Sequence, residues 1–223
     1  MNDIILRAVE KMKGFDQKNP NHCYDLYDHT MKVVEGIQPE NDEELSIAAM
    51  LHDIGKVTCF TETDGVRKYI GHAKASAEQA EILLVEAGYP ADVIEKICWL
   101  VAEHETDLSS KKSMKKRLEV AGEAQVRKLL KLRRADIMAQ APSVQEEHLQ
   151  TVAAAEKALD ELLAEAQQPQ QLTAKDLAIS AKELIALGLK GPEIGQAQRA
   201  ILAEIEAGRL QNTKDEILGY LEN

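Results

Sequence analysis

Residues 41–56 read Asn-Asp-Glu-Glu-Leu-Ser-Ile-Ala-Ala-Met-Leu-His-Asp-Ile-Gly-Lys and contain the pattern that decides the fold. Asn41 is followed three residues later by Glu44, an arrangement typical of a capped helix N-terminus. Apolar residues then recur with helical spacing and predict one buried face: Leu45, Ala48, Ala49, Leu51 and Ile54. The glycine that follows predicts the end of the helix. We therefore expect a buried helix that ends close to the adjacent pair His52 and Asp53.

Helical patterns continue on both sides of this stretch. We expect further helices at residues 24–36, 73–87, 90–101, 124–140, 143–166, 173–187, 192–208 and from 213 onward. Only residues 56–71 break the pattern, where Asp64-Gly65 predicts the turn of a short β-hairpin. The glutamine-rich residues 167–171 read as a linker. The sequence thus predicts an all-α protein with a helical core domain at residues 1–142 and a helical tail at 143–223.

Composition narrows the class of protein. The chain has 223 residues, 44% of them hydrophobic, 29% charged and only 4% aromatic, which indicates a globular protein with a largely aliphatic, helical core. No apolar stretch approaches the roughly 18 residues of a membrane span, and the N-terminus lacks a signal-peptide layout, so we expect a soluble, cytoplasmic protein without a membrane partner. The cysteines, Cys23, Cys59 and Cys98, form no Cys-x-x-Cys pair, which argues against a disulfide framework or a cysteine zinc site.

Charge is unevenly distributed along the chain. The net charge of −11 argues against a general polyanion-binding protein. Residues 111–134, however, contain ten Lys or Arg residues against two Glu, so this basic segment carries +8 and the remainder −19. A solvated helix face and a surface that attracts phosphates are both consistent with this pattern.

Histidines and aspartates recur within or at the ends of the predicted helices, in the order His29, His52, Asp53, His72, His104 and Asp136. Imidazole nitrogen and carboxylate oxygen are ligands for divalent metals. Neighbouring side chains on a helix point about 100° apart, so His52 and Asp53 can reach one centre only at a helix end or across a cleft. Asp53 has two oxygens and could bridge two ions, an arrangement that suits hydrolysis of a phosphate ester. Asp136 stands between apolar neighbours, where an unpaired carboxylate is costly.

These motifs resemble the HD-domain metal-dependent phosphohydrolase superfamily. Within it, the sequence is most similar to the HD domain that follows the polymerase head of bacterial tRNA nucleotidyltransferases (CCA-adding enzymes). The segments that carry this likeness are Asp25–Thr30, Ala48–Lys56, Cys59–Thr61 and Gly71–Ala77. Two later segments, Asp176–Leu184 and Gly191–Gly195, resemble the helical tail of the same enzymes. The likeness covers roughly residues 20–221.

The resemblance implies a fold and a set of roles. It implies an HD-domain helical core followed by a tail subdomain, with one or two divalent ions (Mg, Mn, Fe, Ni or Zn). The first ion would be held by His29, His52, Asp53 and Asp136, and a second, bridged by Asp53, by His72 and His104. Catalytic roles would fall on Asp53, Lys56, His72 and His104. Substrate contacts would come from His22, Lys56, Arg133 and Arg134. Lys56 could equally be a helix C-terminal lysine, and His72 and His104 could cap helix ends.

The function that this resemblance implies is a phosphodiesterase or phosphatase acting on a nucleotide or nucleotide-like phosphate ester through a metal-activated water. The sequence starts at the HD domain and contains no Asp-x-Asp pair of a polymerase head, so we do not expect it to add nucleotides. Two alternatives stay open. One is an RNA-handling or scaffold module with a structural metal site, disfavoured by the net charge. The other is a di-iron protein that uses oxygen. We expect His148 to be solvent-exposed.

Overall fold

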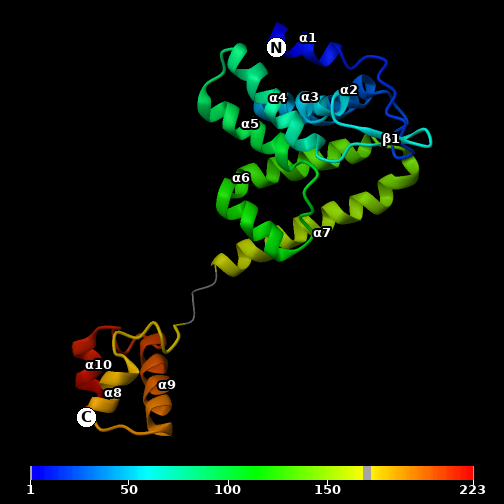
Figure 1. Cartoon of the computed structure of the whole chain (residues 1–223). Coiled ribbons are helices and arrows are strands. Elements are labelled where there is room, and N and C mark those ends of the chain that lie inside the picture. Colours follow the sequence, from blue (N-terminus) through cyan, green and yellow to red (C-terminus); the bar gives the residue numbers. More distant parts are fainter. Residues whose placement is uncertain (1, 168–171, 223) are drawn as a thin grey trace. The chain divides into compact units, whose positions relative to one another are not determined.

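The computed structural model describes residues 2–167 and 172–222 (Figure 1). The chain forms two compact units, Met1–Glu165 and Ala166–Asn223. Four of the five residues of the predicted linker, 168–171, lie outside the described residues. Within the described part, a single two-stranded sheet accompanies the helices, which confirms the all-α prediction. No helix in residues 2–167 or 172–222 combines the length and the apolar character needed to cross a membrane.

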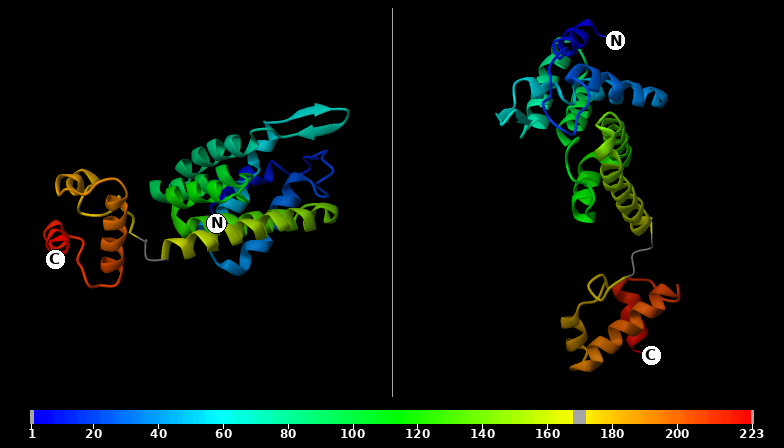
Figure 2. Two further views of the ribbon diagram at one scale, coloured as in Figure 1. Left: turned by 90° about the horizontal axis from the view of Figure 1, so that it is seen from below. Right: turned by 90° about the vertical axis from the view of Figure 1, so that its right-hand side faces the viewer.

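The first unit is a bundle of helices. Its helices are α1 (Asp3–Glu10), α2 (Leu26–Ile37), α3 (Glu43–Leu51), α4 (His72–Glu86), α5 (Ala91–Glu103), α6 (Lys111–Met138) and α7 (Pro142–Gln167), the last of which reaches the boundary with the second unit. The short 3-10 helices η1 (Gln38–Glu40) and η2 (Ile54–Val57) flank α3. Helices α2 to α5 pack on one another, and α6 crosses beneath them against α2 (Figures 1 and 2). Fully buried leucines fill the space between them, among them Leu26, Leu51, Leu100 and Leu129.

Helix α3 starts one residue later than the sequence suggested. Asp42, not Asn41, is its N-cap, and the Asp42 carboxylate accepts a hydrogen bond from the backbone N–H of Leu45 at 3.0 Å. Asn41 instead ends η1 in the left-handed conformation, with φ of 49°. Asparagine tolerates this region better than most residues, and the aspartate is then free to cap the helix.

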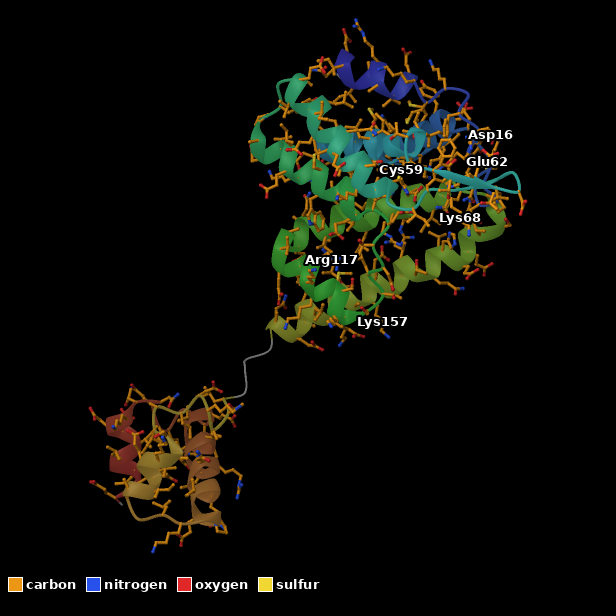
Figure 3. The ribbon with its side chains drawn as sticks, viewed as in Figure 1. Asp16, Cys59, Glu62, Lys68, Arg117 and Lys157 are labelled. Atoms are coloured by element: carbon orange, nitrogen blue, oxygen red, sulfur yellow. The ribbon has the colours of Figure 1, made fainter. Side chains whose placement is uncertain are left out.

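The predicted hairpin is present. Strands β1 (Thr61–Thr63) and β2 (Val66–Lys68) pair antiparallel, and both residues of the connecting Asp64-Gly65 turn have positive φ, as a tight hairpin requires. Arg67 fixes the hairpin to the preceding loop, because its guanidinium lies over the rings of Phe15 and Phe60, 4.9 and 4.4 Å from their centroids. The Arg67 guanidinium also donates to the carbonyl oxygen of Asp16 in that loop at 2.7 Å, and Figure 3 labels Asp16 together with Glu62 and Lys68 of the hairpin.

Helices α6 and α7 are longer than the patterns at residues 124–140 and 143–166 predicted. α6 begins at Lys111 and is kinked at Gly122, whose φ of 78° and ψ of 167° are not helical. α7 begins with Pro142 in its first turn and runs back along α6 (Figure 1), with its buried Ala155, Ala158 and Leu159 in the core of the first unit. The compact units therefore divide after Glu165, whereas the sequence analysis placed the domain boundary at 142.

At Gly122 we expect alanine to destabilise the protein, although helix propensity alone predicts the opposite. In a regular helix, Gly→Ala stabilises by about 1 kcal/mol. At Gly122 the positive φ, together with an extended ψ, is a conformation that L-residues rarely adopt, so we expect Gly122→Ala to lower the free energy of unfolding by about 1–2 kcal/mol. Urea denaturation monitored by circular dichroism measures this change. A gain in stability would contradict the kinked geometry.

In residues 172–222, the second unit forms a small cluster of three helices. It contains α8 (Ala181–Ala186), α9 (Pro192–Glu206) and α10 (Lys214–Leu221). Its core consists of Leu177, Ile179, Leu184, Ile201 and Ile217. The helix predicted at residues 173–187 is wrong in its first half, because a side chain binds backbone groups there that a helix would use. The Asn212 side chain accepts from the Ala178 N–H at 2.8 Å and donates to the Asp176 carbonyl oxygen at 2.7 Å, and α8 starts only at the capping box of Ser180 and Glu183.

Candidate metal centre

Helices α2, α4, α5 and α6 and the end of α3 bring six side chains together in the first unit. The contributions are His29 from α2, His52 and Asp53 after α3, His72 at the start of α4, His104 after α5, and Asp136 from α6. All except Asp136 are at most 3% exposed, and the Asp136 side chain is 17% exposed. The predicted convergence of distant segments is thus observed.

The end of α3 explains how neighbouring residues share one centre. The helix stops at Leu51, His52 is still helical, and Asp53 adopts φ −111° and ψ 5°, a sparsely populated conformation common in active sites. The chain then tightens into η2. Gly55 in η2 lies directly against α4, and its N–H donates to the Ser76 hydroxyl at 2.9 Å. The break at Asp53 turns its carboxylate toward the same point as the imidazole of His52.

One oxygen of Asp53 faces the first group of ligands. Asp53 Oδ2 lies 3.2 Å from His52 Nε2 and 3.6 Å from His29 Nε2. Asp136 completes this side, with Oδ1 at 3.0 Å from His29 Nε2 and 3.8 Å from His52 Nε2. Three of these groups, those of His29, His52 and Asp53, offer ligand atoms that all lie within 4.8 Å of one another.

The other oxygen of Asp53 faces a second group. Asp53 Oδ1 lies 3.0 Å from His72 Nε2 and 3.6 Å from His104 Nε2, and these two nitrogens are 3.2 Å apart. His72, His104 and Asp53 again have ligand atoms within 4.8 Å of one another. Asp53 therefore stands between two clusters and presents one oxygen to each, which is the geometry of a bridging carboxylate.

Backbone carbonyl groups orient all four imidazoles. The Nδ1 atoms lie at hydrogen-bond distance from carbonyl oxygens: His29 from Ala139 at 3.2 Å, His52 from Ala49 at 2.7 Å, His72 from Tyr69 at 2.8 Å and His104 from Val101 at 2.7 Å. A carbonyl oxygen can only accept, so each Nδ1 carries the proton and donates it. Each ring is thereby held with Nε2 directed to the centre, the arrangement that metal-ligating histidines have in proteins.

The centre has the properties of a divalent-ion site. His29 Nε2, His52 Nε2 and Asp53 Oδ1 are buried without a hydrogen-bond partner among the described residues, and Asp53 Oδ2 has only the ion pair with Lys56. Buried polar atoms are nearly always paired, so these unpaired nitrogen and oxygen atoms around Asp53 need a ligand. Mixed imidazole and carboxylate donors suit Mn²⁺, Fe²⁺, Ni²⁺ or Zn²⁺. The residues therefore fit one or two divalent ions.

Charge at the centre is concentrated on Asp53 and Lys56. Burial acts to raise the pKa of Asp53, but His52 and Lys56 outweigh it and hold that pKa well below its usual value, so the carboxylate is ionised. Lys56 is 5% exposed, and its Nζ lies 2.7 Å from Asp53 Oδ2 and 3.2 Å from the Gln17 side-chain oxygen. Burial acts to lower the pKa of Lys56, and the charges of Asp53 and Asp136 outweigh it, so Lys56 keeps its proton.

The residues predicted to contact substrate occupy different places. His22 lies edge-on to His29 with ring centroids 4.9 Å apart, its buried Nδ1 has no partner among the described residues, and burial lowers its pKa to about 3. Arg133 lies beside Asp136 and His104 at the edge of a pocket and donates a hydrogen bond to the carbonyl oxygen of Thr106. Arg134 is directed elsewhere, since it forms an ion pair with Glu156 of α7 at 2.8 Å.

Two pockets open beside the centre and add residues that the sequence analysis missed. They have volumes of about 420 and 260 Å³. Their shared lining consists of Glu105, Gln140 and His148. Glu105 could have been suspected because it follows His104 directly. His148 was expected to be solvent-exposed but is half-buried, because α7 folds back along α6.

The basic segment, residues 111–134, is largely neutralised by its neighbours. Seven of its ten cations lie within 4 Å of a carboxylate: Lys111, Lys115, Arg117, Arg127, Lys128, Lys131 and Arg134. Most of these carboxylates belong to the acidic remainder of the chain, such as Glu161 for Lys111 and Asp42 for Lys128. A surface of paired charges attracts phosphates less than the count of lysines and arginines suggests.

The fold and the centre define a member of a known family. The chain belongs to the HD domain family, whose model matches residues 21–180. It is also 30% identical over 225 residues to the CC-adding tRNA nucleotidyltransferase of Thermus thermophilus. That similarity covers 98% of this chain and 49% of the relative, so the chain spans about half of the relative's length. Both parts of the resemblance noted in the sequence are confirmed.

Proposed function

We propose that this protein is a metal-dependent phosphohydrolase that acts on a nucleotide or nucleotide-like phosphate ester. The observation that carries the proposal is the placement of Asp53, which offers one oxygen to His29 and His52 and the other to His72 and His104. A divalent ion bound there supplies Lewis-acid chemistry, because it polarises phosphoryl oxygens and promotes the deprotonation of water.

The chain's own residues would have three roles in this reaction. His29, His52, Asp53 and Asp136 would hold one ion, and His72 and His104 would hold a second against the other oxygen of Asp53. Because their Nδ1 atoms are engaged by carbonyl oxygens, the four imidazoles are preorganised, and little reorientation would be needed on binding.

Lys56 and Arg133 would bind the phosphate. Lys56 is a buried cation beside Asp53, and with a divalent ion bound to that carboxylate its ammonium can turn to a phosphate oxygen. Arg133 is partly buried and has no carboxylate within 4 Å among the described residues, so its guanidinium can serve as a fork for an anion. His22, which lines the larger pocket, is neutral at physiological pH and could donate or accept one hydrogen bond there. Arg134 would have to leave Glu156 to contribute.

A metal-supplemented activity assay tests this function. We expect the purified protein to hydrolyse bis(p-nitrophenyl) phosphate or ribonucleotide esters when Mn²⁺, Ni²⁺ or Mg²⁺ is added, and to lose this activity in excess EDTA. Arg133→Leu should lower kcat/KM by about 10- to 100-fold, since it removes a charge-assisted contact worth roughly 1.5–3 kcal/mol. Arg134→Leu is the matched control and should change kcat/KM less than twofold. Absence of turnover with every metal and ester would contradict the proposal.

An RNA-handling role is the second candidate, and it is favoured by the similarity to an enzyme named for tRNA. Against it stand the net charge of −11 and the paired cations of the basic segment. A salt series separates the two: an RNA-binding module would bind tRNA with an affinity that falls steeply as salt rises. On the hydrolase account, tRNA affinity at physiological salt is weak and is unchanged by Asp53→Asn.

A further inference from the structure

The wall shared by the two pockets comes largely from a part of the chain that the proposed chemistry does not use. Gln140 follows the end of α6, and His148 lies in the second turn of α7. The larger pocket also contains Lys56 and His72, and the smaller contains His104 and Asp136. Gln140 and His148 therefore face both spaces beside the centre, where the organic part of a phosphate ester would lie.

A hydrogen bond fixes the chemistry that His148 can offer. Its Nδ1 lies 2.7 Å from the side-chain oxygen of Gln140, and that oxygen can only accept, so Nδ1 carries the proton and donates it. In the neutral ring the second nitrogen, Nε2, is then free to accept a hydrogen bond, and no residue in the described part of the chain occupies it. Gln140 thus acts as a positioning residue that sets both the orientation and the tautomer of His148.

The polar groups of this wall differ from those that would bind the phosphate. Lys56 and Arg133 are cations, whereas the shared wall offers an acceptor on the imidazole of His148, two donors on the amide of Gln140 and the acceptor oxygens of Glu105. Thr151 adds a hydroxyl that donates to the His148 carbonyl at 2.6 Å and keeps its own lone pairs. Closely spaced donors and acceptors beside a carboxylate are complementary to vicinal hydroxyl groups and not to a second phosphate or an apolar chain.

We propose that His148, held by Gln140, is a specificity-determining residue that hydrogen-bonds the sugar hydroxyls of a ribonucleotide whose phosphate lies at the metal centre. This inference rests on the proposed function for the position of the phosphate. The inference also names the class of substrate: a ribonucleotide would bind in preference to a nucleotide that lacks the sugar hydroxyls. It also assigns α7 a role in recognition.

Binding measurements test this proposal without requiring turnover. The probes are adenosine 5′-monophosphate and 2′,3′-dideoxyadenosine 5′-monophosphate, titrated into the full chain with Mn²⁺ by calorimetry. A hydrogen bond between neutral groups contributes about 0.5–1.5 kcal/mol, so we expect the ribonucleotide to bind roughly 2- to 10-fold more tightly. His148→Phe keeps an aromatic ring but cannot accept a hydrogen bond, and it should remove the preference while leaving the dideoxy affinity unchanged.

Control variants distinguish recognition from a structural effect. Gln150→Ala changes an exposed residue of the same helix that lines neither pocket, and it should retain the full preference. Gln140→Leu should reduce the preference, because it releases the His148 ring. Three results would overturn the proposal: no preference in the unmodified protein, equal weakening of both probes by His148→Phe, or no binding of either probe. A preference that depends on His148 in a protein that hydrolyses no ester would support the recognition role and contradict the proposed function.

Discussion

Asp53→Asn should abolish metal-dependent hydrolysis of phosphate esters, with a fall in kcat on the order of 10³-fold or more. The carboxylate faces both clusters of imidazoles, so its replacement removes a charged ligand from two ion positions at once. Metal ions contribute several kcal/mol of transition-state stabilisation, and each 1.36 kcal/mol corresponds to a tenfold change in rate. Steady-state kinetics with Mn²⁺ on bis(p-nitrophenyl) phosphate measures this loss.

Two further variants make the Asp53 result interpretable. Removing a buried charge beside Lys56 also destabilises the fold by several kcal/mol, so the variant must be shown to be folded by circular dichroism. Asp136→Asn affects a side chain that is 17% exposed, and it should reduce activity with a smaller loss of stability. Asp92→Asn, on the surface of α5, is the matched control and should retain full activity. Hydrolysis by folded Asp53→Asn at an unchanged rate would contradict the assigned role.

Gly55→Ala should be the most damaging single-methyl substitution in the first unit. A Cβ at Gly55 would lie 2.6 Å from the backbone nitrogen of Ser76 and 2.8 Å from the carbonyl oxygen of His72. Both contacts are to the backbone of α4, so no side-chain rotation relieves them. Overpacking of this kind costs about 1–3 kcal/mol, and relief requires α4 to move away. Because His72 begins α4, we expect weaker metal binding together with a lower free energy of unfolding.

Gly36→Ala is the matched control for this substitution. Its added Cβ would lie 3.3 Å from the Ala135 Cβ, a mild approach between α2 and α6, and alanine favours the helix by about 1 kcal/mol. We therefore expect little net change in stability. Urea denaturation of both variants, with and without Mn²⁺, gives the comparison. Equal stability of Gly55→Ala and the unmodified protein would show that α4 does not pack on Gly55 as described.

The sequence was informative where one local pattern determines both structure and chemistry. His52 and Asp53 follow an apolar helix that has to end near them, so their joint position could be predicted. The approach of Asp136 to His29 depends on the packing of α2 against α6, where Gly36 lies close to Ala135. In the sequence, only the resemblance to the HD-domain superfamily assigned these two residues to the same ion. The spacing of apolar residues indicates which face of a helix is buried. Which other helix packs on that face depends on the fold of the whole chain.

Other features could not be predicted, for physical reasons that the structure makes plain. Arg133 and Arg134 are neighbours with the same chemistry, yet one lines a pocket and the other pairs with Glu156. The choice depends on the rotation of α6 relative to α7. His148 reaches the cleft because α7 folds back at Pro142, a turn whose direction the sequence does not encode locally. In the tail, the bonds of Asn212 to the backbone of Asp176 and Ala178 replace a predicted helical turn.

On the proposed function, distant segments of the chain hold divalent ions on both sides of Asp53. A crystal structure with Mn²⁺, with the metal located by its anomalous scattering, tests it most directly. We expect two peaks, one among Asp53 Oδ2, His29, His52 and Asp136, and one among Asp53 Oδ1, His72 and His104. A crystal saturated with Mn²⁺ that shows no ion in contact with Asp53 would contradict it.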